Sequence, residues 1–363
     1  MKKIAIVYDW MDSWGGVERL LLELHRLYPD AAWYTSYVDP KSGSWAEKLA
    51  LKTSFIQNLP PFIRKSRILS LPFYPYAFES FDFSGFDVVI SVTSGFAKGI
   101  ITRPGTTHIS YILSPPRYLW GFTDEYVTGW KKHISSKLFK SLRIWDYIAA
   151  QRPDVLLTLS DAVAKRCVTY YQREATVIYP PFDVDYWQNL SPKPVTKLPK
   201  DYYLVVSRLE PYKKIVLAIE AINAMPDKHL VIVGKGRLEK NLKSIAGDRV
   251  HFYQDLSDAE LAYIYTQAKA LIMPQEEDFG YVSLEAQTFA CPVVAYAQGG
   301  AAETVIEGQS GVLFPEQSLS ALQAGLARLP SLSYNVGEVR KSVARFSPEH
   351  FRKTLLQVIE AIV

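Results

Sequence analysis

Short apolar runs rich in valine and isoleucine recur along the chain, and each is followed by a stretch with helical periodicity. The runs lie at 3–8, 88–92, 107–112, 155–159, 177–179, 203–206, 230–233, 251–253, 270–273 and 292–295. Uninterrupted apolar strands that alternate with helices are typical of parallel sheets covered by helices on both faces. The sequence therefore predicts an α/β protein with doubly wound, Rossmann-like sheets.

The strand and helix pattern restarts in the middle of the chain, which indicates two domains. A proline-rich segment without hydrophobic periodicity, 191–200, follows soon after the restart and has the composition of a linker. The 363 residues also exceed what a single core usually supports. We therefore predict one domain over 1–182 and a second over 183–345, facing a central cleft, with an amphipathic helix over 346–363.

Composition argues against several classes of protein. The two cysteines are too few for a disulfide framework, and the six histidines show no metal-ligand spacing. The apolar start of the chain is short and is interrupted by Asp9 and Asp12, which favours a first strand over a signal peptide. No apolar run approaches the ~20 residues of a membrane span. These features predict a cytoplasmic protein.

The positive charge of the chain gathers in its first half, in two segments that mix basic and apolar residues. These segments are 59–74 and 131–143. A basic amphipathic segment can bind an anionic membrane surface, where each basic residue contributes ~1 kcal/mol. A solvated helix face is the alternative. Nucleic acid is not favoured as a partner, because the second half is slightly acidic and no nucleic-acid-binding motif is present.

Glycine-rich loops follow two of the predicted strands, and ligands of parallel sheets bind beyond the carboxyl ends of the strands. Gly15 and Gly16 follow the first strand, and Gly234 begins a Gly-Lys-Gly turn in the second domain. Glycine lets the backbone approach a phosphate or a sugar. A simple tight turn explains both loops equally well.

A third loop lies in the segment EEDFGYVSLEA, at 276–286, which carries acids at both ends. A helix that starts near Tyr281 would hold Glu285 about one turn inside and leave Glu277 in the loop before it. Phe279-Gly280 lets the chain turn into that helix. Two carboxylates would then frame one helix start, with a solvated helix entrance as the alternative.

Together these segments resemble a known family. Glu277 and Glu285 have the E-x7-E spacing of retaining family 4 glycosyltransferases, which use nucleotide sugars and have the two-domain GT-B fold. The segment 206–213, VSRLEPYK, is similar to the family's diphosphate clamp. Further similar segments lie at 8–10, 15–16, 97–99, 115–118, 177–181, 270–280, 292–294, 299–300, 303 and 311–315. The first-domain segments are most similar to bacterial polysaccharide mannosyltransferases that use GDP-mannose.

The resemblance implies a role for each residue of a catalytic and donor-binding site. Arg208 and Lys213 would hold the diphosphate, Glu285 the ribose hydroxyls, and Glu277 the hydroxyls of the donor sugar. Fixed cations lower the barrier because negative charge grows on the leaving diphosphate in the transition state. A carboxylate suits sugar hydroxyls because it accepts two at once. The other positions expected to line the nucleotide sugar are Gly15, Gly16, Gly234, Phe279 and Gly280.

The family's reaction implies neither a protein nucleophile nor a metal ion. Attack on the front face of the sugar, with the leaving phosphate taking the proton of the acceptor hydroxyl, needs no paired nucleophile and acid. The clamp cations supply the charge that divalent ions bring elsewhere. Asp183-Val-Asp185 spells the DxD motif of metal-dependent glycosyltransferases, but it falls at the domain crossover. We expect no metal, and no cofactor besides the donor substrate.

One position departs from the family pattern. Relatives commonly carry a histidine where this chain has Leu113, and that histidine is thought to line the donor sugar. Its loss leaves open a different sugar or an inactive protein. His108 lies near the amino end of the same predicted strand, and we expect it to be structural. Lys98 and Arg117 are candidates for positive charge on the acceptor side, with a plain surface position as the alternative.

The sequence thus predicts a retaining hexosyltransferase that moves mannose from GDP-mannose to a lipid-linked oligosaccharide in bacterial surface polysaccharide synthesis. The resemblance places the nucleotide on the second domain and the acceptor on the first, and implies that the tail helix packs back on the first domain. The basic segments fit peripheral association with the inner face of the cell membrane. One alternative is a nucleotide-sugar epimerase of the same fold, for which acid and base groups beyond Glu277 are missing. The other is a non-catalytic nucleotide-sugar-binding subunit, which the change at Leu113 leaves open and against which Arg208, Lys213, Glu277 and Glu285 argue.

Overall fold

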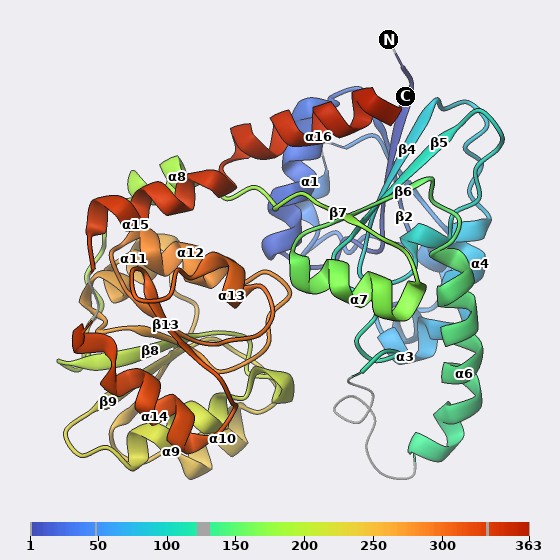
Figure 1. The fold of residues 1–363 in the computed structure, drawn as a ribbon. Coiled ribbons are helices and arrows are strands. Elements are labelled where there is room, and N and C mark those ends of the chain that lie inside the picture. Colours follow the sequence, from blue (N-terminus) through green and yellow to red (C-terminus); the bar gives the residue numbers. More distant parts are fainter. Residues whose placement is uncertain (1, 48, 122–130, 332–333, 363) are drawn as a thin grey trace. The chain divides into compact units, whose positions relative to one another are not determined.

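The computed structural model describes residues 2–47, 49–121, 131–331 and 334–362, without the side chains of 131–136. The chain divides into two compact units, one formed by Met1–Pro181 with Phe351–Val363 and the other by Phe182–His350. The division lies next to the boundary expected between residues 182 and 183. Each unit contains a parallel sheet flanked by helices, so the predicted α/β class with two Rossmann-like domains is confirmed (Figure 1).

The first unit is built on a seven-stranded sheet with the order β3-β2-β1-β4-β5-β6-β7. Its strands are β1 (Ile4–Tyr8), β2 (Ala32–Thr35), β3 (Leu51–Thr53), β4 (Val88–Thr93), β5 (Thr107–Ile112), β6 (Val155–Thr158) and β7 (Thr176–Val177). All six residues of the central strand β4 are buried, which explains its continuous apolar sequence. The sequence did not predict β2 and β3, because both are short and β3 includes the polar Lys52 and Thr53.

Helices α4 and α6 cover one face of this sheet through a core that includes Val7, Val89, Phe78 and Leu142. On α16, Arg352 donates a 2.7 Å hydrogen bond to the buried Glu23 of α1, and Figure 1 shows the two helices side by side. The helices of this unit are α1 (Gly16–Leu27), α2 (Pro61–Arg64), α3 (Arg67–Ser70), α4 (Tyr74–Glu79), α6 (Lys131–Ala149) and α7 (Asp161–Tyr171), with the 3-10 turns η1 (Ser44–Ala46), η2 (Phe55–Asn58), η3 (Leu71–Phe73) and η4 (Ala97–Gly99).

The second unit has a six-stranded sheet with the order β10-β9-β8-β11-β12-β13. Its strands are β8 (Tyr202–Val206), β9 (His229–Val233), β10 (Val250–Tyr253), β11 (Leu271–Met273), β12 (Val293–Tyr296) and β13 (Gly311–Phe314). Alternate residues of β8 enter two separate cores, because successive side chains of a strand point to opposite faces. Tyr203 and Val205 pack with α9, α10 and α14, whereas Tyr202 and Leu204 pack with α11, α12 and α13 (Figure 1).

In the second unit, α9 to α13 connect successive strands, whereas α8 precedes β8 and α14 and α15 follow β13. These helices are α8 (Val184–Gln188), α9 (Ile215–Asn223), α10 (Glu239–Ile245), α11 (Asp258–Gln267), α12 (Tyr281–Thr288), α13 (Ala301–Thr304), α14 (Leu319–Ala327) and α15 (Val336–Val343), with η5 (Pro211–Lys213), η6 (Leu329–Ser331) and η7 (Ala344–Phe346). Helix α16 (Pro348–Ile362) follows, and its residues from Phe351 onward cluster with the first unit. Within the described part of the chain, no helix combines the length and apolar character needed to cross a membrane.

Candidate active site

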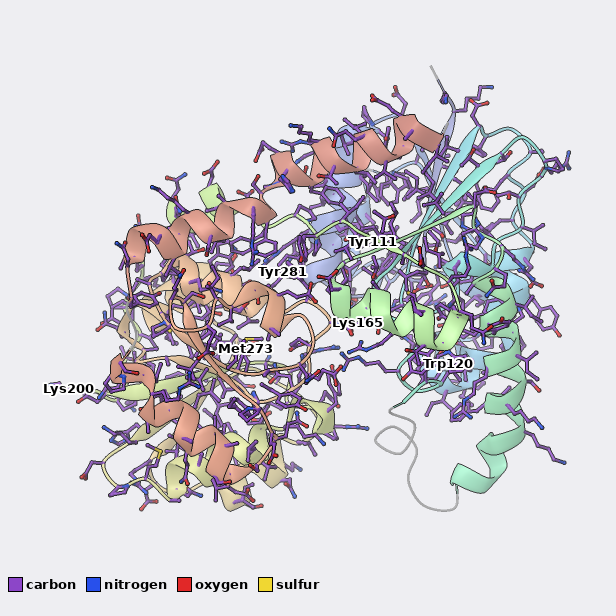
Figure 2. The ribbon with its side chains drawn as sticks, viewed as in Figure 1. Tyr111, Trp120, Lys165, Lys200, Met273 and Tyr281 are labelled. Carbon is purple, nitrogen blue, oxygen red and sulfur yellow. The ribbon has the colours of Figure 1, made fainter. Side chains whose placement is uncertain are left out.

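Loops that follow three neighbouring strands of the second unit carry most of the candidate residues. The order β9-β8-β11 and the parallel direction of these strands put their carboxyl ends at one edge of the sheet. Arg208 and Lys213 follow β8, Gly234 follows β9, and Glu277 follows β11. Figure 2 labels Met273, the last residue of β11, and Tyr281, the first of α12, which bound the Glu277 loop.

An ion pair joins two of these loops. Lys213 Nζ contacts Glu277 Oε1, and Gln275 Nε2 donates to the same carboxylate oxygen at 2.7 Å. The side chains of Lys213 and Glu277 are only 11% and 19% exposed. Removing two charges from water is costly even when they pair. The arrangement suits a ligand that carries an anionic group beside hydroxyl groups, since the ammonium donates and the carboxylate accepts.

Two glycines hold the Glu277 loop in its conformation. Gly300 N donates to Glu277 O at 2.9 Å, and Gly299 pairs with Glu277 in an isolated parallel bridge. A Cβ at Gly299 would lie 2.3 Å from Glu277 O, and one at Gly300 would lie 2.3 Å from Phe279 Cα. Gly280, with φ of 94°, then turns the chain into α12. Glycine is therefore required at 299 and 300 by close backbone packing, as well as at 280 by conformation.

Glu285 is a buried carboxylate on α12. It is 6% exposed, and Tyr265 OH donates to its Oε2 at 3.1 Å. Phe279, in the loop before the helix, is also buried. The solvated helix entrance considered for this segment therefore does not describe Glu285. Burying a carboxylate costs free energy unless partners satisfy it, so its position at this edge of the sheet needs a reason beyond solubility.

The loop after β8 is packed closely against the loop after β9. Gly234 has a φ of 146°, and a Cβ there would lie 1.9 Å from Ser207 O. Packing between the two loops thus explains this glycine without any ligand. The exposed Arg208 lies on the same loop, and its Nη2 donates to Tyr212 OH at 2.7 Å. Arg208 and Lys213 thus differ, since one guanidinium is open to solvent and the other cation is enclosed.

In the first unit, Gly15 is the N-cap of α1 and Gly16 its first residue, on the loop that follows β1. A Cβ at Gly15 would lie 3.4 Å from Glu18 Oε2, which is an ordinary contact. Local packing therefore does not require glycine at 15, in contrast to Gly234. Burial raises the pKa of the Glu18 carboxyl, the largest effect on that group.

Asp9 is a buried residue that holds a loop of the first unit in place, and the sequence did not reveal this role. It lies just after β1, is fully buried, and its carboxylate accepts hydrogen bonds of 2.8 Å from the backbone N–H groups of Ser94, Phe96 and Ala97. Thr93 Oγ1 adds a further bond of 2.9 Å. Asp9 thereby fixes the loop after β4. In the sequence it is merely the acid that ends an apolar run, and the partners lie more than eighty residues away.

The structure corrects the expectation for Lys98. This side chain is 1% exposed, and its ammonium pairs with the equally buried Asp146 of α6. Trp120 Nε1 and Tyr171 OH donate to the other Asp146 oxygen at 2.7 and 2.9 Å. Lys98 is therefore neither a surface cation nor open to an acceptor. It is a positioning residue that ties η4 to α6 and, through Asp146, to the loop that carries Trp120.

The remaining first-unit residues lie along β5 and the loop after it. His108 is fully buried 2.8 Å from Ser91 Oγ, and burial lowers its pKa to about 3, so the expected structural role is confirmed. Leu113 is buried and continues the backbone pairing with Thr93. Arg117 is half-buried on the loop that follows, and its acceptor-side role stays a prediction.

The DxD sequence forms a helix cap. Asp183 Oδ1 accepts a 2.9 Å hydrogen bond from Tyr186 N, and this capping satisfies a free backbone donor at the start of α8. In the part of the chain that the structure describes, no cluster of three or more His, Cys, Asp and Glu side chains is arranged to hold a metal ion.

The fold of the two units is that of the GT-B class. The lipopolysaccharide outer core galactosyltransferase WaaB is similar with a TM-score of 0.70 and 16% identity, covering 99% of this chain and 100% of that one. Sucrose-phosphate synthase from Thermosynechococcus elongatus has a TM-score of 0.74, 19% identity, and coverage of 100% and 99%. Anabaena HepE in complex with UDP has a TM-score of 0.69, 17% identity, and coverage of 99% and 100%.

Part of the chain is similar in sequence to glycosyl transferases of group 1. Residues 188–348, nearly all of the second unit, match the family model described as glycosyl transferases group 1. The human alpha-1,3/1,6-mannosyltransferase ALG2 is 26% identical over 52% of this chain and 52% of its own length. The D-inositol 3-phosphate glycosyltransferase of Mycolicibacterium gilvum is 35% identical over 30% of this chain and 27% of its own length. The chain therefore spans about half, or less, of the length of these relatives.

The close packing at Gly300 generates a test. Gly300→Ala must displace the Phe279 backbone, so we expect a loss of about 1–3 kcal/mol in the free energy of unfolding, measured with urea. Gly85→Ala is the control, because a Cβ there meets nothing within 4 Å. Equal stability of the two variants would show that the Glu277 loop is not fixed by this contact.

Proposed function

We propose that this protein is a retaining glycosyltransferase that transfers mannose from GDP-mannose to a lipid-linked oligosaccharide in bacterial surface polysaccharide synthesis. The observation that carries the proposal is the enclosed Lys213–Glu277 pair at the carboxyl ends of β8 and β11, one loop before the buried Glu285. The matched family model covers this same unit, which supports the reaction class.

The donor would exchange the internal ion pair for two contacts of its own. Lys213 would bind a diphosphate oxygen as a point charge, and Glu277 would accept hydrogen bonds from hydroxyls of the sugar. Arg208, exposed on the same loop as Lys213, would add a guanidinium fork to the diphosphate. Glu285 would hold the ribose. Because Lys213 and Glu277 are in contact, the two donor groups that they bind must be neighbours, as a diphosphate and its sugar are.

The proposed reaction breaks the bond between the anomeric carbon and the diphosphate oxygen, and forms a bond from that carbon to the acceptor oxygen on the same face. The acceptor proton passes to the leaving phosphate, so the products are a glycoside and a protonated nucleoside diphosphate. The enclosed cation acts in the transition state, because charge on the leaving group is greatest there. In this scheme Lys213 and Arg208 take the electrostatic role for which other enzymes use a metal ion.

The choice of donor rests on relatives. ALG2 is named as a mannosyltransferase, and the first-domain segments resemble mannosyltransferases that use GDP-mannose. The complexes of HepE hold UDP and UDP-glucose instead, and that protein is only 17–18% identical. We propose GDP-mannose on the first-domain resemblance.

We also propose that the first unit binds the inner face of the cell membrane, through an apolar surface on α2, α3, η3 and α4. The surface consists of five side chains that are between 36% and 76% exposed: Phe62, Ile68, Leu69, Phe73 and Tyr76. Single exposed apolar residues are common, whereas five of them within 62–76 support the proposal of an interaction surface. A lipid-linked acceptor would be reached from such a position.

The cations of segment 59–74 contribute less to membrane binding than the sequence suggested. Arg64 donates to Gln57 O, Lys65 pairs with Asp39 at 2.7 Å, and Arg67 pairs with Asp12 at 2.6 Å, so each basic side chain has a partner in the protein. In segment 131–143, the side chains of 131–136 lie outside the described residues. Lys137 and Lys140 of α6 are exposed and form no ion pair among the described residues. The attachment that we propose is therefore mainly apolar.

The Lys213–Glu277 pair predicts opposite effects on transfer and on nucleotide affinity. Glu277→Gln should lower kcat about 100-fold, because a sugar contact is lost, while GDP binds as tightly as before or more tightly, since Lys213 is released. Lys213→Met should weaken GDP at least about tenfold, because a charge-assisted bond to phosphate is lost. The rate of transfer is measured from the GDP that is released, and the affinity for GDP is measured by calorimetry.

Glu276→Gln is the matched control, since it removes the neighbouring carboxylate but leaves the E-x7-E spacing intact. We expect nearly wild-type transfer from this variant. If Glu276→Gln abolishes transfer while Glu277→Gln does not, the assignment is wrong by one residue. Equal loss of transfer and of GDP affinity in Glu277→Gln would contradict a contact of Glu277 with the sugar.

The apolar surface predicts membrane binding that salt does not abolish. The double variant Phe62→Ser, Ile68→Ser should lower partition into vesicles of phosphatidylglycerol and phosphatidylethanolamine at least tenfold at 0.5 M salt, measured by co-sedimentation. Ile101→Ser is the control, because Ile101 is 53% exposed but lies outside the surface. Equal partition of all three proteins would refute the surface as the membrane contact.

A further inference from the structure

Two tryptophans on adjoining loops of the first unit have no part in the proposed donor site. Trp14 is 57% exposed on the loop between β1 and α1. Trp45, on η1, meets it edge to face with ring centroids 6.3 Å apart at 69°. Trp45 Nε1 donates to Ser13 O at 3.2 Å, which ties the second ring to the backbone that carries the first. A large indole surface is thus held open to solvent.

Backbone hydrogen bonds and close packing at Met11 hold the start of the loop that carries Trp14. Met11 N donates to Tyr37 O at 3.0 Å, and Asp39 N donates to Met11 O at 2.9 Å. Gly43 packs so closely that a Cβ there would lie 2.4 Å from Met11 O. These contacts fix the loop in place. A ligand that stacks on Trp14 therefore binds with little entropy cost for ordering the loop.

A carboxylate with spare acceptor capacity lies two residues before Trp14. Arg67 and Tyr37 both donate to Asp12 Oδ2, while Asp12 Oδ1 has no hydrogen-bond partner among the residues that the structure describes. The side chain is 22% exposed. The guanidinium of Arg67 also lies 3.8 Å from the centre of the Trp10 ring, which fixes the pair in place. Asp12 can therefore accept hydroxyl hydrogen bonds without moving.

We propose that Trp14 and Asp12 form a subsite for one pyranose ring of the acceptor glycan. The inference rests on the proposed glycosyltransferase function. An indole face covers the apolar C–H face of a sugar ring, and a carboxylate oxygen accepts bonds from its hydroxyls. The pairing of these two groups favours a sugar over a bilayer, because acyl chains offer no hydroxyl donor to the carboxylate. The subsite directly precedes Gly15 and Gly16 in the loop that leads into α1.

The test is sugar binding by the full chain, measured by NMR titration with soluble mannotriose, maltotriose and cellotriose. We expect at least one trisaccharide to bind in the millimolar range, Trp14→Ala to weaken it at least tenfold, and Trp14→Phe to weaken it less. Asp12→Asn keeps an oxygen acceptor, so its affinity for the trisaccharide should lie between those of Trp14→Ala and Trp14→Phe. Phe55→Ala is the control, since it removes an aromatic ring that is 42% exposed elsewhere in the same unit.

Two results would overturn the subsite: no binding of any trisaccharide by the wild type, or the same affinity in Trp14→Ala as in the wild type. Melting temperatures of all variants confirm that they are folded. GDP binding by the same samples reports on the donor site in the other unit. Failure of sugar binding with GDP binding intact refutes the subsite alone, whereas loss of GDP binding in the wild type refutes the proposed function.

Discussion

The contact between Lys213 and Glu277 is the interaction on which the candidate site depends. The two residues are 64 positions apart and meet because β8 and β11 are adjacent parallel strands. Each charge is largely removed from water, an arrangement that stabilises a fold only weakly and is costly to break. The loop that carries Glu277 is fixed in turn by Gly299 and Gly300. A site built in this way is rigid before its ligand arrives. Its charged groups can therefore stabilise a transition state without the free-energy cost of reorganising.

The first unit uses buried charge for a different purpose. Asp9 fixes the loop after β4, and Lys98 with Asp146 joins η4 to α6. These buried groups therefore position loops and helices inside the unit. Its exposed groups lie elsewhere, Trp14 on the loop after β1 and the apolar surface on the short helices of 62–76. The division is a common one in α/β proteins, where a fixed scaffold carries variable binding groups at the ends of strands.

Much of the fold could be predicted because apolar runs alternate with helices, whereas β2, β3 and β13 escaped notice. All three strands are short, with four, three and four residues, so their sequences carry little periodic signal. The E-x7-E spacing located Glu277 and Glu285, but spacing cannot show that Lys213 contacts Glu277. Lys98 was misjudged for the same reason, since its partner Asp146 lies in a distant helix. Local sequence predicts which residues share a loop; pairing between loops follows from strand order.

The most direct test of the central claim is calorimetric titration of the wild-type protein with GDP, UDP, ADP and dTDP, in the presence of a chelator and again with magnesium. Two cations at the carboxyl edge of the second sheet should bind a nucleoside diphosphate without a divalent ion. GDP should bind most tightly, with an affinity that magnesium does not change. Binding that requires magnesium, or no binding of any of the four nucleotides, would contradict a donor site built on Lys213 and Glu277.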